Sequence, residues 1–93
     1  MYRQIELNPN RLTTQDDMQK YMQELFFFES EDAAADLGAL EDSLSDVKDE
    51  IDFILTPDAI MKICMDEFAY KVLLAVGRAC DRNPNLNVLF RRG

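Results

Sequence analysis

The 93-residue sequence contains no histidine and no tryptophan, and only three glycines and three prolines. Without histidine, no Ser–His or Cys–His pair can activate a nucleophile, and a common nitrogen ligand of zinc and iron is missing. The few glycines do not form a phosphate-binding loop. Carboxylates recur between Asp42 and Glu50, but without the glycine of a calcium-binding loop. We therefore expect neither an enzyme nor a metal site, and no cofactor.

Basic residues are also scarce: the sequence has 10 Lys and Arg but 18 Asp and Glu, which gives a formal net charge of −8. A charge of this sign argues against binding to nucleic acid or to an anionic membrane surface. Positions 29–52 alone carry −9, with Lys48 as the only base. Such crowding costs self-repulsion in the folded state, which a basic protein partner would offset. The acids in this window are Glu29, Glu31, Asp32, Asp36, Glu41, Asp42, Asp46, Asp49, Glu50 and Asp52.

Cysteine is rare, and long apolar segments are missing. No run approaches the roughly 20 apolar residues of a membrane-spanning helix, and positions 1–4 do not begin a signal peptide. Cys64 and Cys80 both fall on apolar helical stripes, so we expect two buried free thiols rather than a disulfide. These features predict a cytoplasmic protein with one domain over residues 1–93, monomeric when free.

Three short segments have the apolar pattern of β-strands, at positions 2–7, 51–55 and 86–91. Helix start signals, each followed by apolar residues at helical spacing, predict two helices between each pair of successive strands. The first helix is expected to close with the phenylalanines at positions 26–28. The residues expected to open the helices are the Thr13-Thr14 pair, Asp36, Thr56 and Asp66.

The predicted element order is therefore β-α-α-β-α-α-β. A long helical connection separates each pair of successive strands, so the strands should run parallel. The first strand keeps a polar face, and so in part does the third, through Asn87 and Arg91. Helices should consequently cover only one face of the sheet. We predict an α/β fold of two layers.

The second predicted helix carries most of the functional interest. Leu37, Leu40 and Leu44 form its buried stripe, and a rotation of about 100° per residue places Glu41 on the flank of that stripe. Glycine inside a helix costs roughly 1 kcal/mol relative to alanine, so Gly38 is unusual there. The residues on the side opposite the leucines are Gly38, Asp42, Ser45 and Asp46.

Three stretches, at positions 5–25, 36–44 and 68–90, together span nearly the whole chain and share a family pattern. The second reads DLGALEDSL, and the third contains a long helix, an Asn-Pro turn and a closing strand. The second resembles the Asn-Leu-Asp-Ala-Leu-Trp-Asp-x-Leu helix of barstar-like proteins, which are small cytosolic ribonuclease inhibitors. The resemblance implies a three-stranded parallel sheet of order 1-2-3 with helices packed on one face.

In that family, the corresponding helix and the loop before it plug the nuclease active site, and carboxylates take the places of substrate phosphates. The second aspartate of the family motif matches Asp42, whereas Gly38 replaces the first aspartate and Glu41 replaces the tryptophan. The resemblance therefore implies an inhibitor or immunity-type protein that blocks a basic partner, most plausibly a ribonuclease or nuclease toxin. The expected contact residues are Asp42, Glu41, Asp36, Gly38, Ser45 and Asp46, with Asp32 and Phe28 from the preceding loop.

An alternative reading is an acyl-carrier-like protein. The tripeptide at positions 42–44, in an acidic small protein, resembles the Asp-Ser-Leu of acyl carrier proteins. In those proteins the serine carries phosphopantetheine, and the matching residue here is Ser43. Acyl carrier proteins are all-helical and place this serine at the start of a helix. The predicted strands, and the position of Ser43 within a helix, therefore oppose this alternative.

Overall fold

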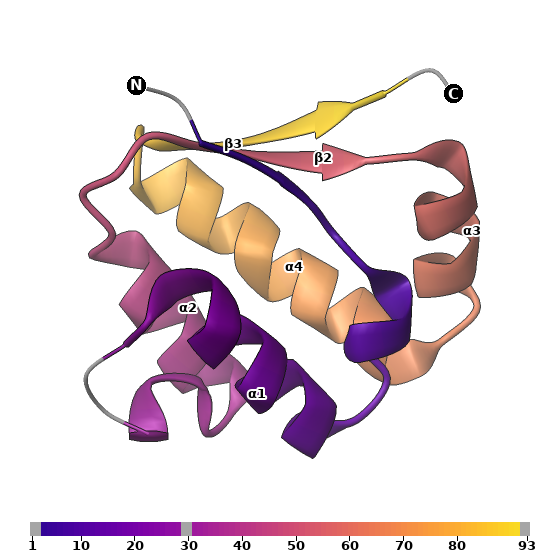
Figure 1. The fold of residues 1–93 in the computed structure, drawn as a ribbon, viewed down its shortest axis with the longest axis horizontal. Helices are drawn as coiled ribbons and strands as arrows, with labels where there is room; N and C mark the ends of the chain where they lie inside the picture. The colour runs from indigo at the N-terminus through magenta and orange to yellow at the C-terminus, as the bar shows by residue number, and fades with distance from the viewer. Residues whose placement is uncertain (1–2, 29–30, 92–93) are drawn as a thin grey trace.

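The computed structural model of the chain describes residues 3–28 and 31–91 and contains a three-stranded parallel sheet, as the sequence predicts (Figure 1). The order of strands in the sheet matches the order in the sequence. The strands are β1 (Arg3–Glu6), β2 (Ile51–Leu55) and β3 (Leu86–Phe90).

Four α-helices connect the strands, two in each crossover. Each opens at one of the expected capping residues, whose side chain accepts a hydrogen bond from the backbone N–H three residues later. The helices are α1 (Gln15–Phe26), α2 (Leu37–Ser45), α3 (Pro57–Cys64) and α4 (Glu67–Arg82). Their N-cap residues are, in the same order, Thr14, Asp36, Thr56 and Asp66. Two 3-10 helices, η1 (Pro9–Arg11) and η2 (Glu31–Ala34), occupy connecting segments that have no helical pattern in the sequence.

The helices cover one face of the sheet, so the fold has the two layers that were predicted (Figure 1). In the sheet register Ile5 lies beside Phe53, and Phe53 lies beside Val88, so these side chains share the face turned toward the helices. Phe53 is fully buried there. Burial of a large apolar side chain stabilises a fold by roughly 1.5–3 kcal/mol. Other side chains without accessible surface are Met18, Met22, Leu40, Leu44, Ile51, Ile63, Val72 and Val76.

The opposite face of the sheet is polar at its edges but buries one apolar residue of the central strand. Ile54 is only 4% exposed, although it points away from the helices. Glu6 on β1 and Leu89 on β3 flank it in the register. The guanidinium of Arg91, just after β3, lies 3.0 Å from the Glu6 carboxylate. This ion pair joins a residue of β1 to one just after β3, on either side of the central strand.

The prediction of two buried thiols is wrong for one cysteine. Both cysteines are free, as expected, and Cys80 is half-buried. Cys64, however, is exposed at the last residue of α3. Since α3 has only eight residues, Ala59 and Ile63 fill its contact with the core, and Cys64 follows them past the edge of that contact.

Candidate functional site

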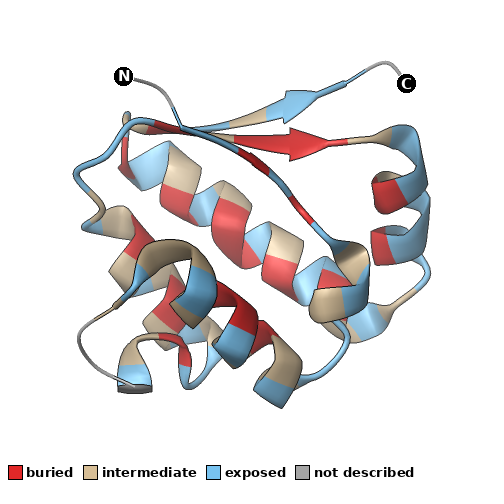
Figure 2. Ribbon diagram, viewed as in Figure 1, coloured by how far each residue is buried: buried red, intermediate tan, exposed pale blue. Residues whose placement is uncertain are grey.

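The helix α2 lies against α4, with its leucines turned inward and its polar side turned to solvent (Figure 2). Leu40 and Leu44 have no accessible surface. Gly38, Asp42 and Asp46 are exposed, as the helical spacing predicts. The helix starts where it does because the Asp36 carboxylate accepts the N–H of Ala39 at 2.7 Å, as expected for a helix N-cap.

The carboxylates of α2 differ in their surroundings. The Asp42 side chain is 75% exposed, and Asp46 is exposed at the C-cap of the helix. Ser45 is half-buried, and its hydroxyl donates to the carbonyl of Glu41 at 2.7 Å, so this hydroxyl is committed to the helix itself. The two exposed acids on this side of α2, Asp42 and Asp46, are both aspartates, which have short side chains.

Glu41 lies on the flank of α2 next to α4, and two arginines of α4 neutralise it. Its carboxylate is 3.0 Å from Arg82 and 3.5 Å from Arg78, and the Glu41 side chain is only 21% exposed. Arg82 also approaches Asp42 at 3.4 Å. The pairing ties α2 to α4 and reduces the negative potential on this flank. Glu41 is thus less available to an outside partner than the sequence suggests, whereas Asp42 keeps most of its surface.

The segment before α2 is held close to the helix. The Ser43 hydroxyl donates to the carbonyl of Ala33 at 2.7 Å. The side-chain amide of Gln15, at the start of α1, donates to the carbonyls of Ala34 and Ala35 at 2.9 and 2.6 Å. Asp32 is exposed on this segment. The two hydrogen-bonding side chains therefore fix where the exposed Asp32 lies relative to α2.

A hollow of about 650 Å³ lies at the C-terminal end of α2, between that helix, the end of α1 and the start of β1. It brings together two residues expected in the site, Phe28 and Asp46. The hollow mixes aromatic rings with charges of both signs. The lining residues are Arg3, Phe26, Phe27, Phe28, Ser43, Asp46, Val47, Lys48 and Asp49.

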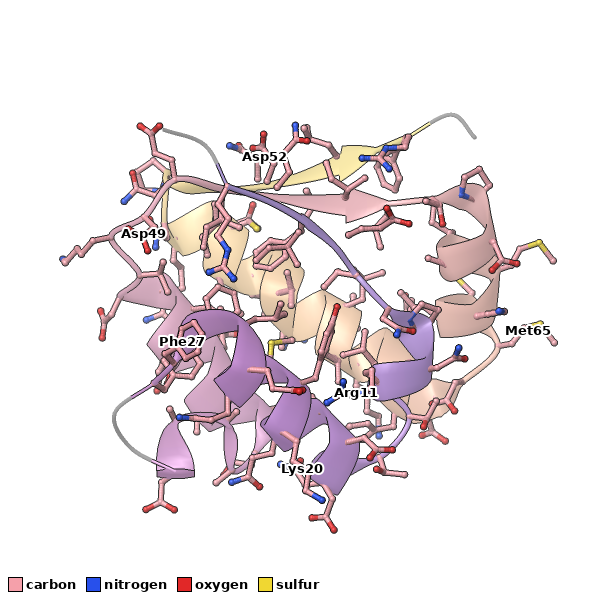
Figure 3. All side chains as sticks on the ribbon, in the orientation of Figure 1. Arg11, Lys20, Phe27, Asp49, Asp52 and Met65 are labelled. Atoms are coloured by element: carbon pink, nitrogen blue, oxygen red, sulfur yellow. The ribbon has the colours of Figure 1, made fainter. Side chains whose placement is uncertain are left out.

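The phenylalanines at the end of α1 do not all belong to the helix, contrary to the prediction. The helix ends at Phe26, and Phe27 adopts left-handed backbone angles with φ of 52°. Phe26 and Phe28 turn back toward the core and stack with ring centroids 5.4 Å apart. Phe27 is 78% exposed, on the same side of the molecule as Asp49 (Figure 3). The exposed aromatic residue is therefore Phe27 rather than Phe28.

Several residues of this surface do not stand out in the sequence. Arg78 and Arg82 are about forty positions from Glu41, and only the packing of α4 on α2 brings them together. The sequence prediction named Phe28, whereas the end of α1 at Phe26 leaves Phe27 as the exposed phenylalanine. Asp49 belongs to the acidic window, but its place beside the aromatic residues depends on the path of the chain after α2.

The structure also bears on the acyl-carrier alternative and on metal binding. Ser43 lies in the second half of α2, is half-buried and donates to Ala33, so it does not resemble a solvent-facing serine at a helix start. Within residues 3–28 and 31–91, no group of three or more Cys, Asp or Glu side chains is placed to hold a metal ion. No helix in the same ranges is long and apolar enough to cross a membrane.

Neither a comparison with models of protein families nor one with curated protein sequences gives a match for this chain. The strand order 1-2-3 that the barstar resemblance implies is present, with two helices in each crossover. The functional proposal below therefore depends on the fold, on the charges and on the surface around α2.

Proposed function

We propose that this protein is an inhibitor of a basic enzyme, most plausibly a ribonuclease, and that it docks α2 and the segment before it into the partner's active site. The observation that supports this proposal is the display of Asp42 and Asp46 on one exposed side of α2. A ribonuclease active site is cationic because it holds phosphates. Two carboxylates on one helix face can take the positions of those phosphates and accept charge-assisted hydrogen bonds from Arg or Lys.

The acidic window favours rapid encounter with such a partner. Of its acids, Asp32, Asp36, Asp42, Asp46, Asp49 and Glu50 are exposed on or near α2. A concentration of like charge raises the association rate with an oppositely charged protein and makes that rate fall as salt is added. The internal pairs of Glu41 with Arg78 and Arg82 remove one carboxylate from this field but leave the solvent side of α2 acidic.

Aromatic contacts would complete the interface beside the charges. Phe27 is exposed at the rim of the hollow that also contains Asp46. Interfaces concentrate their binding energy in a few aromatic and charged residues. The proposed contact surface therefore extends from Asp42 to the end of α1. Within it we propose Phe27, instead of Phe28, as the aromatic contact residue.

The proposal is tested with a barnase-type ribonuclease as the probe, by titrating the protein against cleavage of a fluorogenic RNA. The change is Asp42→Ala. Asp58→Ala is the matched control, because the Asp58 side chain is 76% exposed on α3 and is also near a cation, Lys62 at 3.2 Å. We expect inhibition by the parent and by Asp58→Ala, and about 10–100-fold weaker inhibition by Asp42→Ala, since a lost charge-assisted hydrogen bond costs roughly 1.5–3 kcal/mol.

Two results would count against the proposal. If the parent does not inhibit the ribonuclease at micromolar concentration, the assignment of a ribonuclease partner is wrong. If Asp42→Ala inhibits as well as the parent does, the binding surface is not the exposed side of α2. A stopped-flow measurement at increasing salt gives an independent check, because the proposal requires the association rate to fall.

A further inference from the structure

The outer edge of β3 has the properties of a surface that pairs with another strand. Within residues 3–28 and 31–91, β3 pairs only with β2, so its other edge faces outward. The strand contains no charge and no proline. Its C-terminal half is apolar and accessible, since Leu89 is 43% exposed, Phe90 is 72% exposed and Val88 is half-buried.

The other edge of the same sheet, at β1, is protected against pairing with a strand of another chain. The edge strand β1 has Arg3 at its start and Glu6 at its end, and Pro9 follows shortly after. Charges and proline at an edge are the usual means by which proteins prevent strands from pairing with other chains. The five residues of β3 include no charge and no proline, and Pro84 and Arg91 lie just outside the strand.

The backbone of β3 leaves a defined set of groups free at this edge. Ile51 donates to the carbonyl of Asn85, and Arg91 donates to the carbonyl of Leu55, so the odd-numbered residues of this stretch face β2. Because neighbouring residues in a parallel strand alternate in direction, the N–H and C=O groups of Val88 and Phe90 face outward. The N–H of Leu86 is already used, because it donates to Asn83.

We propose that two copies of this chain pair through β3 in antiparallel fashion, with the twofold axis at Leu89. In this register Val88 of each copy lies opposite Phe90 of the other, and their outward N–H and C=O groups form four hydrogen bonds. Leu89 meets Leu89 of the second copy on the open face of the sheet. The register thus uses the free backbone groups of both residues and covers the exposed apolar side chains of the strand.

The helix layer is compatible with this arrangement. A twofold axis perpendicular to the sheet keeps the helices of both copies on the same side. The solvent-facing side of α4 carries Tyr70 and Leu74, which are 46% and 39% exposed.

The charge distribution selects a second copy rather than an unrelated basic protein. A basic partner is attracted to the acidic side of α2, whereas the C-terminal half of β3 lies away from α2 (Figure 1) and carries no charge. Two chains of net charge −8 repel one another, and this repulsion is smallest where they meet through a neutral surface such as β3. Two five-residue edges bury less than the roughly 1,200 Å² at the lower end of stable interfaces, so we expect a weak dimer that forms at high concentration.

Sedimentation equilibrium from roughly 10 μM to 1 mM tests the proposal, and it does so without a ribonuclease. We expect the average mass to rise from one chain, 10.8 kDa, toward about twice that value. Phe90→Lys should keep the protein monomeric across this range. Met65→Lys is the matched control, because Met65 is 83% exposed just after α3, away from β3, and its replacement should leave the dimer intact.

A second variant tests the backbone pairing. Val88→Pro removes an outward N–H without breaking a bond to β2, and proline is tolerated at such edge positions. We expect this variant to weaken the dimer while its thermal unfolding shows that it remains folded. The proposal is overturned if the parent stays monomeric at millimolar concentration, if Phe90→Lys dimerises like the parent, or if the mass rises without limit beyond two chains.

Discussion

Arg82 on α4 lies 3.0 Å from the carboxylate of Glu41 on α2. The same guanidinium is 3.4 Å from Asp42, so one cation faces two neighbouring carboxylates of α2. Asp42 remains 75% exposed despite this contact. The protein thus partly screens the residue that we expect to matter most for binding. The strength of the acidic surface is therefore adjustable through a residue that does not itself belong to α2.

Replacing Arg82 by alanine should accelerate binding to a cationic ribonuclease. The variant removes a positive charge next to Asp42 and makes the local field more negative, so the association rate at low salt should rise by a few-fold. The cost in stability should be at most about 1 kcal/mol, because the Arg82 side chain is 53% exposed and Glu41 keeps its pairing with Arg78. Stopped-flow mixing with the ribonuclease measures the rate. Arg91→Ala, which removes the same charge beside Glu6 on the sheet, should change the rate less.

Replacing the buried Asn83 should destabilise the fold. Its side-chain amide donates to the carbonyls of Leu44 and Val47 at 3.0 and 2.8 Å, and its side-chain oxygen accepts the N–H of Asn85 at 3.0 Å. Asn83→Ala removes these three hydrogen bonds from a buried site and leaves the N–H of Asn85 without the Asn83 oxygen, so we expect the free energy of unfolding to fall by about 1–3 kcal/mol. Urea denaturation measures the loss. Asn87→Ala should change stability by less than about 0.5 kcal/mol, since Asn87 is exposed on β3.

Cys80 should react with alkylating agents only at high pH in the folded protein. Burial, reinforced by the negative charge of Asp81, raises the pKa of the Cys80 thiol from 9.0 to about 11. In a Cys64→Ser background, the alkylation rate of the native protein should therefore rise with a midpoint near pH 11, and that of the urea-unfolded chain near pH 9. Equal midpoints for the two states would contradict the burial of this thiol.

The same shift predicts a loss of stability in alkali. Between pH 9 and 11 the unfolded chain has released the Cys80 proton while the folded chain retains it. The unfolded state then binds fewer protons, so the free energy of unfolding falls as the pH rises through this window. Cys80→Ala should flatten this part of the pH profile, because alanine does not titrate.

The sequence predicts structural features that depend on residues close together in the chain. Thr14, Asp36, Thr56 and Asp66 each cap a helix as expected, since a cap depends on a side chain and a backbone N–H only three residues away. The parallel sheet followed from the long helical connections, because parallel strands need a crossover of this kind and two helices in each connection supply it.

The sequence does not predict features that depend on contacts between distant parts of the chain. The exposure of Cys64 depends on how far α3 extends past the core, and its apolar neighbours gave the wrong impression. Ile54 is buried on the face without helices, where the ion pair of Arg91 and Glu6 joins residues 85 positions apart. The screening of Glu41 by α4 likewise requires the folded arrangement. Sequence patterns predicted which helix face Glu41 lies on but not which residues lie over it.

The ties that hold α2 have a consequence for how tightly a partner can be bound. Ser43 fastens the helix to the segment before it, and the amide of Asn83 fastens its C-terminal carbonyls to the end of α4. Because the backbone of α2 is already ordered before a partner docks, this protein loses conformational entropy on binding only through the side chains of the helix. That loss is roughly 0.5–1.5 kcal/mol for a long flexible side chain, and short aspartates at positions 42 and 46 keep it near the lower end.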